Sequence, residues 1–395
     1  MKLKNIYINA IGGIQELEIN FNPYMNIICG PNGIGKTTIL ECIAQTFTYN
    51  SHSFVRKKAD RPYGMWVLTN DNNQSFEVRK NNFHPEDMMA PQFTQQPPSP
   101  SNIIFIKTNR YFDYVPLTSI SKDNADLDRQ YKDANLLISG LQISDAKNWF
   151  IHRHLWSAHD NSLTQEQKHN FEVAKTIFGK LDDSFSFSKV KASSYDILLR
   201  QTDGSEIYFE YLSSGYKSVV FILLGLIKEL ELRFDNPGIK VDAFSGIVLI
   251  DELDLHLHPK WQSQILKVLR EIFPNVQFIA STHSAHIIQS ANSDEIIPLV
   301  RDENGNVNKR ELASNRFGYK GWTVEEVLKD VMGLEDTRSI EFNEALNTFE
   351  YAIDQENLII AKENYAILQE MLHPTNHIRK LLKLQLATLG ERIDD

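Results

Sequence analysis

The sequence predicts an α/β fold, in which a central sheet is covered by helices. Three observations support this prediction. A short apolar run at 25–30 stops at a glycine, and a helical pattern follows it at 36–47. Two later runs, 246–250 and 276–282, are continuously apolar, which is typical of strands buried on both faces. Strand, glycine-rich turn and helix therefore follow one another near the start of the chain, and further buried strands come later.

The other elements are expected from their periodicity and turn residues. Two strands joined by a turn at Gly12 and Gly13 are expected within 3–21, and a hairpin is expected at 64–79. A single strand is expected at 102–108. A further hairpin is expected at 195–212, with its turn at Asp203–Gly204. Helices are expected at 214–234 and 259–273, through most of an insertion at 121–180, and from 321 to 395 with an interruption at 373–376. The Pro-, Gln- and Ser-rich stretch 84–101 is expected to be a loop.

These elements suggest four segments. They are a first lobe at 1–120, a mostly helical insertion at 121–190, a second lobe at 191–315 and a helical C-terminal region at 316–395. A chain of 395 residues is long enough for two domains or for one domain with large insertions.

The bulk composition excludes some classes of protein. Hydrophobic residues make up 42% and charged residues 23%, which is ordinary for a globular protein. The net charge is −10, so any contact with nucleic acid should be local. Cys29 and Cys42 lack metal-ligand spacing and should be buried and reduced. The first ten residues have no signal-peptide core, and the apolar run near 219–227 is too short to cross a bilayer, so we expect a cytoplasmic protein without membrane contact.

The first candidate site is the segment GPNGIGKT, which fits the phosphate-binding pattern G-x-x-x-x-G-K-[ST] between a strand and a helix. Glycines let backbone N–H groups turn toward phosphate oxygens, and the helix N-terminus adds partial positive charge. Lys36 would bind the β- and γ-phosphates, and the Thr37 hydroxyl would ligate Mg²⁺. The expected nucleotide-binding residues are Gly30, Pro31, Asn32, Gly33, Ile34, Gly35, Lys36, Thr37 and Thr38.

The second candidate is the acidic pair Asp251–Glu252, directly after the apolar run at 246–250. A carboxylate at the C-terminal end of such a strand faces the phosphate crevice, so Asp251 is expected to hold Mg²⁺. Glu252 is expected to polarise the water that attacks the γ-phosphate.

Two further segments complete the set. Ser213, Ser214 and Gly215 begin a long helix, where a hydroxyl, a glycine and the helix dipole make a second anion site. If two copies pair head to tail, this site can reach the γ-phosphate held by Lys36 of the other copy. His283 follows the buried run at 276–282, so its imidazole should also reach the crevice.

The four motifs in this order resemble ATP-binding-cassette ATPases of the SMC/RecF/OLD type. The resemblance covers residues 1–300 and implies a P-loop NTPase head with a mixed central sheet, flanking helices and an antiparallel β subdomain. It also implies ATP and Mg²⁺ as ligands and Asp254 to His258 as a loop that contacts the neighbouring subunit. Ser214 and Tyr216 differ from the residues usual at these positions of the family's signature motif. The glutamine of the family's Q-loop has no clear counterpart, and Gln74 and the 92–96 cluster are the candidates for it.

The compact head with a helical tail resembles the ATPase subunits of multi-gene antiphage systems, of the PtuA type of Septu and retron-linked loci or the AriA type. This resemblance implies a slow ATPase that forms a homodimer or higher homo-oligomer, and that senses or scaffolds while a separate nuclease of HNH or Toprim type is the effector. The helical pattern at 351–372 contains apolar residues that must be buried, either against a partner or against the subunit's own core. They are Leu358, Ile359, Tyr365, Leu368 and Leu372.

Three other functions remain open from the sequence. A metal-dependent nuclease would use Asp254, His256 and His258, although Pro259 suggests a turn there. A RecF-like repair ATPase would bind DNA through a local basic patch, and a transporter ATPase fits less well. The candidate patch residues are Arg56, Lys57, Lys58, Lys107, Arg110 and Lys122.

Overall fold

The computed structural model forms two compact units, Met1–Gly333 and Leu334–Asp395. The structure describes residues 1–50, 55–87, 89–109, 116–117, 119–120, 129–141, 146–180, 182–234, 238–312, 316–334 and 336–390. The first unit therefore includes residues 316–333, which the sequence analysis grouped with the C-terminal region.

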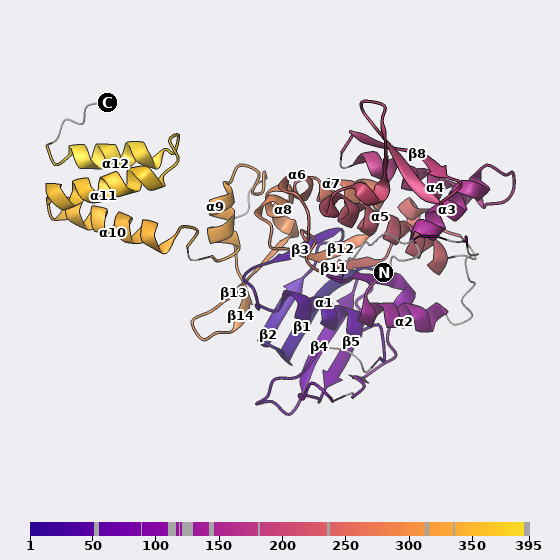
Figure 1. Cartoon of the computed structure of the whole chain (residues 1–395). Coiled ribbons are helices and arrows are strands. Elements are labelled where there is room, and N and C mark those ends of the chain that lie inside the picture. Colours follow the sequence, from indigo (N-terminus) through magenta and orange to yellow (C-terminus); the bar gives the residue numbers. More distant parts are fainter. Residues whose placement is uncertain are drawn as a thin grey trace. The chain divides into compact units, whose positions relative to one another are not determined.

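A six-stranded mixed sheet lies at the centre of the first unit (Figure 1). In sheet order its strands are β14 (Val307–Lys309), β13 (Ile296–Arg301), β3 (Met25–Cys29), β12 (Gln277–Ser281), β11 (Ile247–Ile250) and β7 (Ile103–Ile106). All neighbouring strands pair in parallel except β13 and β14. The sequence pattern had indicated β3, β7, β11 and β12 but not β13 or β14.

Alternate residues of this sheet enter two different hydrophobic cores. On β11, Val248 and Ile250 enter one core, which also contains α5, whereas Ile247 and Leu249 enter the other, which contains α1. Strands β7 and β12 divide their side chains in the same way. The continuous apolar runs in the sequence follow from this burial on both faces.

A five-stranded antiparallel sheet packs in the core that contains α1. Its order is β2 (Ile14–Asn20), β1 (Leu3–Ile11), β4 (Gly64–Asn70), β5 (Ser75–Lys80) and β6 (Gln92–Phe93). Both predicted hairpins are present, and the predicted loop at 84–101 contributes the two-residue strand β6. The mixed central sheet with flanking helices and this antiparallel subdomain confirm the predicted fold class.

The helices cover both faces of the central sheet. The first unit contains α1 (Lys36–Gln45), α5 (Ser214–Arg233), α6 (Pro259–Gln262), α7 (Ile265–Ile272), α8 (Ala285–Ser290), α9 (Val324–Glu326) and a π-helical turn at Val327–Val331. Short 3₁₀ turns lie at Pro100–Asn102, Phe209–Tyr211, Val241–Ala243 and Ser293–Glu295. The single helix predicted at 259–273 is divided into α6 and α7, although neither proline nor glycine lies at the break.

The insertion carries three helices and a small sheet. The helices are α2 (Arg129–Ser139), α3 (Ala146–Ser157) and α4 (Gln165–Lys180). Strand β8 (Phe185–Lys191) pairs with β9 (Asp196–Gln201), which pairs with β10 (Glu206–Tyr208), all antiparallel. The described residues of the insertion expected at 121–190 are mostly helical, and the insertion ends in β8, whose Phe-Ser-Phe-Ser alternation is a strand signal.

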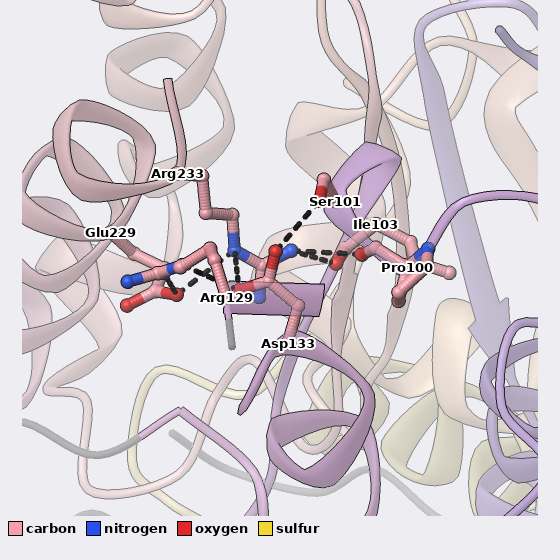
Figure 2. A network of polar contacts seen from close by, with 7 residues as sticks. All are labelled: Pro100, Ser101, Ile103, Arg129, Asp133, Glu229 and Arg233. Atoms are coloured by element: carbon pink, nitrogen blue, oxygen red, sulfur yellow. Dashed lines mark hydrogen bonds and ion pairs between the residues drawn. The ribbon is translucent and has the colours of Figure 1, made fainter. Parts of the chain in front are cut away.

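A buried charged network fastens the insertion to α5 and to the start of β7 (Figure 2). Arg233, on the last turn of α5, donates from Nε to Glu229 at 2.9 Å and from Nη1 to the carbonyl of Ile103 at 2.5 Å, and lies 3.4 Å from Asp133. Arg129 of α2 binds both Asp133 and Glu229. Two guanidinium groups thus balance two carboxylates where three elements meet.

The second unit consists of three helices, α10 (Ile340–Asp354), α11 (Leu358–Met371) and α12 (Ile378–Ala387), around a core of its own. Leu368 and Leu372 are buried in this core, and Leu358 and Tyr365 pack against it. Ile359 points to solvent with 72% of its surface exposed. The predicted apolar positions therefore mainly cover the unit's own core.

Two smaller expectations can be compared with the structure. Cys29 and Cys42 are free and buried. Among the described residues, none of the helices combines the length and the apolar character needed to span a bilayer.

Candidate nucleotide site

Three of the four candidate segments meet at one edge of the central sheet. Strands β3, β12 and β11 are parallel neighbours, so their carboxyl ends lie side by side. The loop Gly30–Gly35 follows β3, Asp251 follows β11, and His283 comes shortly after β12. Segments more than 200 residues apart in the chain are brought together by strand pairing alone.

The loop after β3 has the backbone of a phosphate cradle. Gly30, Gly33 and Gly35 have φ values of 140°, 71° and 109°, a region that side chains rarely adopt. At Gly30 an added Cβ would overlap the backbone carbonyl of Leu299, so glycine is required there for space as well as for conformation. Helix α1 begins at Lys36, directly after Gly35, and its N-terminus points into the loop's end.

Lys36 is held inside the loop. Its Nζ donates to the carbonyls of Gly30 and Pro31, at 2.9 Å in each case, and the residue is 6% exposed. Burial lowers the pKa of Lys36 below its ordinary 10.5, while the nearby Asp251 carboxylate acts in the opposite direction. An ammonium satisfied by two loop carbonyls can exchange them for phosphate oxygens.

Asp251 and Thr37 form a pair of hard oxygen ligands. Thr37 Oγ1 lies 3.1 Å from Oδ1 and 3.0 Å from Oδ2 of Asp251. Ser281 Oγ donates to the same carboxylate at 2.6 Å, which fixes its orientation. Mg²⁺ prefers one or two protein oxygens together with phosphate oxygens and water. The donor set of Thr37 and Asp251 fits that requirement.

The residues after Asp251 are fastened to the loop that carries His283. The backbone N–H of Glu252 donates to Ser281 Oγ at 2.7 Å, and Glu252 has a φ of 49°, which is uncommon for a residue with a side chain. Asp254 Oδ1 accepts hydrogen bonds from Thr282 Oγ1 at 2.6 Å and from the His283 backbone N–H at 3.0 Å. The acidic and histidine segments therefore form one connected unit.

His283 is neutral near pH 7. Burial lowers its pKa below the ordinary 6.5, and the charge of Lys36 lowers it further, whereas Asp254, Glu252 and Asp251 act in the opposite direction. A neutral imidazole can both donate and accept a hydrogen bond. The hydrogen bond from its backbone N–H to Asp254 joins His283 to the acidic segment of the site.

The fourth segment lies elsewhere. Ser213 is the N-cap of α5 and accepts from the backbone N–H of Tyr216 at 3.3 Å, and both Ser213 and Ser214 are exposed. An added Cβ on Gly215 would overlap the carbonyl oxygen of His256. Helix α5 packs in the core on the other face of the sheet from α1. Within the described part of the chain, no hydrogen bond or ion pair joins 213–215 to 30–38.

Several contacts at this edge were not foreseen from the sequence. Strand β7 pairs with β11 and ends beside Asp251, whose backbone N–H donates to Ile106 at 2.9 Å. The next residue is Lys107, which binds Glu41 of α1 at 2.6 Å. Gln74, a candidate for the Q-loop glutamine, lies in the β4–β5 turn and is hydrogen-bonded to Asn70. The sequence carries no signal for the role of Lys107, because its position depends on the pairing of β7 with β11.

The alternative sites find little support. His258 Nδ1 accepts from the backbone N–H of Lys260 at 3.3 Å, and Asp254 is bound as above. Within the described ranges, no three or more His, Cys, Asp or Glu side chains are arranged to hold a metal ion.

The candidate basic patch is also largely engaged within the chain. Arg56 donates to the carbonyl of Pro85 at 3.0 Å, Lys57 donates to that of Arg61 at 2.7 Å, and Lys107 pairs with Glu41. Arg110 and Lys122 lie outside the described residues.

Comparisons with known proteins found a matching family model, similar sequences and similar solved structures. A family model described as "AAA domain, putative AbiEii toxin, Type IV TA system" matches residues 25–289. The Septu protein PtuA of Bacillus thuringiensis is 44% identical over 402 residues, which cover 99% of this chain and 99% of that protein. The retron Vc95 probable ATPase of Vibrio cholerae serotype O1 biovar El Tor is 34% identical over 158 residues, 40% of this chain and 29% of its own length. The SMC head domain from Thermotoga maritima is 15% identical, covers 79% of this chain and 100% of its own, and superposes with a TM-score of 0.45.

Proposed function

The chain belongs to the family of the Septu protein PtuA, and from this membership and the AAA domain matched at 25–289 we propose that it is an ATPase of an antiphage defence system. In this proposal it binds Mg·ATP, hydrolyses it slowly and controls a separate effector nuclease. The observation that carries the ATPase activity is the convergence of Lys36, the Thr37–Asp251 pair and His283 at one sheet edge.

Each residue has a defined task in the reaction. The loop amides and Lys36 bind the β- and γ-phosphates. Thr37 and Asp251 would hold Mg²⁺, which neutralises charge on the phosphate oxygens. Glu252 accepts a hydrogen bond from the attacking water, and neutral His283 donates one to the γ-phosphate. Product release requires these contacts to open, which is consistent with slow turnover.

The complete site requires a second copy of the chain. Ser213 and Ser214 are exposed at the start of α5, and α5 lies on the opposite face of the sheet from α1. A head-to-tail dimer places this helix N-terminus against the γ-phosphate held by the other copy, where its backbone N–H groups complete the anion site. ATP then joins the two subunits, and hydrolysis separates them.

The partner is proposed to be a nuclease of HNH or Toprim type. The similarity to the Septu protein PtuA suggests PtuB as this partner. The ATP-dependent dimer would act as the sensor, because closing and opening changes which surfaces a bound nuclease can reach. Copurification of the two proteins with ATP, but not with ADP, would support this part of the proposal. Equal recovery with both nucleotides would count against nucleotide control.

Mixing two inactive variants tests the composite ATPase site. One carries Lys36→Ala and the other Ser213→Arg, and each alone should hydrolyse ATP at a small fraction of the wild-type rate. A one-to-one mixture should regain about a quarter of wild-type activity, since half of randomly mixed dimers hold one complete site of two. The control replaces the second variant with Lys36→Ala/Ser213→Arg, which can complete no site. If the mixture stays as inactive as the control, the composite site is wrong.

Glu252→Gln separates hydrolysis from binding. This variant should bind ATP and remain dimeric while its turnover falls by about 10²-fold or more. Hydrolysis at the wild-type rate would exclude Glu252 from the reaction.

A further inference from the structure

Arg301, the last residue of β13, contacts the tip of the phosphate-binding loop. Its Nη2 donates to the carbonyl of Gly33 at 2.9 Å, and its Nη1 donates to the carbonyl of Gly305 in the β13–β14 turn at 3.0 Å. The guanidinium also lies beside the β1–β2 turn, because a Cβ built on Gly13 would be 3.8 Å from Nη2. One side chain therefore joins three segments around the loop.

The contact determines how one peptide group of the loop is turned. In a trans peptide the C=O and the following N–H point in opposite directions. Since Arg301 holds the Gly33 carbonyl, the N–H of Ile34 is directed away from Arg301. The orientation of this N–H matters because a phosphate cradle binds its ligand through backbone donors.

Ile34 is buried in the core, so one side of this peptide is restrained, but the Gly33 side has few packing contacts. Gly33 has a φ of 71°, and among the described residues no heavy atom lies within 4 Å of a Cβ built there. Glycine loses more conformational freedom on ordering than any other residue. By contrast, a Cβ built on Gly30 would overlap the carbonyl oxygen of Leu299, and one built on Gly35 would lie 3.2 Å from the Ile14 side chain. Among the three loop glycines, Gly33 depends most on a hydrogen bond to keep its conformation.

We infer that Arg301 is a positioning residue for nucleotide binding, which pre-orders the Gly33–Ile34 peptide for the phosphates of ATP. The inference deepens the proposed function and rests on it. Arg301 acts through the loop backbone, so its contribution is to ordering the site before the ligand arrives. Its removal should weaken binding of the nucleotide in the ground state and the transition state equally, which raises KM and leaves kcat unchanged.

If Arg301 only stabilised the fold, its replacement would lower the melting temperature without a specific loss of nucleotide affinity. Arg301 is exposed, so its replacement should change the melting temperature little. Arg301→Ala should nevertheless raise the Kd for Mg·ATP by about tenfold or more, the lower end of the range for a hydrogen bond from a charged donor. The Kd of Arg301→Lys should lie between those of the wild type and Arg301→Ala, because an ammonium can donate to the Gly33 carbonyl but lacks the planar guanidinium that also binds Gly305.

The experiment measures Mg·ATP binding by calorimetry and steady-state hydrolysis on the full chain. The variants are Arg301→Ala, Arg301→Lys and, as a control on the same hairpin, Lys309→Ala, whose side chain is exposed. A raised Kd and KM with kcat within about twofold, partial recovery in Arg301→Lys and an unchanged control support the inference.

Two results would overturn it. One is wild-type affinity in Arg301→Ala, and the other is a fall in kcat with KM unchanged. If the wild-type chain itself binds no ATP, the proposed function fails first, which the same titration shows before any variant is compared.

Discussion

Thr37 Oγ1 lies 3.0 Å from Oδ2 of Asp251, although the two residues are 214 positions apart. This pair predicts that Asp251→Asn abolishes the gain in ATP affinity that Mg²⁺ provides, because the metal loses a charged ligand. Affinity measured with Mg²⁺ should fall by at least about tenfold, while affinity in excess chelator should not change. Glu303→Gln, at an exposed position, is the charge-matched control. An equal loss with and without Mg²⁺ would indicate a structural defect instead.

The contact between α5 and the loop after Asp251 is tested by Gly215→Ala. The new Cβ would overlap the carbonyl oxygen of His256, so this loop must move. We expect ATP hydrolysis to fall by about tenfold or more, since small displacements of catalytic groups are costly, with about 1–3 kcal/mol lost from the free energy of unfolding. Gly321→Ala, which adds a Cβ in open space, should change neither quantity. Normal turnover in Gly215→Ala would show that the contact does not position the loop.

The buried network predicts a large stability effect far from the nucleotide. Arg233→Met leaves Asp133 and Glu229 with fewer cationic partners, and removing one member of a buried pair typically costs about 3–5 kcal/mol. Lys180→Ala breaks the exposed pair with Glu271 and should cost about 1 kcal/mol or less. Chemical denaturation of the two variants measures both quantities. Similar losses in the two variants would contradict this account of the network.

The same network should contribute to acid sensitivity. Burial alone would raise the pKa of Glu229, but Arg233 and Arg129 outweigh it and hold that pKa below the ordinary 4.5. A carboxylate with a lowered folded-state pKa stabilises the protein above its unfolded pKa, and this stabilisation is lost as pH falls through the folded value. The wild-type chain should therefore lose stability more steeply below pH 4.5 than Arg233→Met does.

His283 predicts the pH dependence of catalysis. Because its pKa is held below 6.5, kcat/KM for ATP should fall along an acid limb centred below pH 6.5, as the imidazole gains a proton. His283→Gln should be slower at pH 7.5 and should lack this acid limb. A limb centred above pH 6.5, or one that persists in His283→Gln, would exclude His283 as its origin.

The elements that carry the motifs were predictable because their signals are local. The run before Gly30 and the run before Asp251 are continuous and apolar, and each strand ends where a polar or glycine residue begins. Strand β13 was missed because Pro298 interrupts its apolar run, and proline normally argues against an interior strand. In the structure, β13 pairs with β3 from Ile296 to Pro298 and with β14 from Leu299 to Arg301, so Pro298 lies where the partner strand changes.

The contacts that complete the site could not be predicted in the same way. Lys107 and Arg301 belong to no motif, and their roles depend on which strands become neighbours. Pairing of β7 with β11 places Lys107 near Glu41, and pairing of β13 with β3 places Arg301 near Gly33. Strand order is a non-local property, so a single sequence contains no periodic signal for these contacts.

The left-handed backbone of Glu252 has a consequence for how this enzyme would respond to selection. A side chain in that conformation costs about 1–3 kcal/mol, which a glycine at position 252 would largely recover. The same substitution would remove the carboxylate that we propose polarises the attacking water. Stability and activity therefore make opposite demands on one residue. Variants chosen for heat resistance alone would accumulate inactive enzymes at this position.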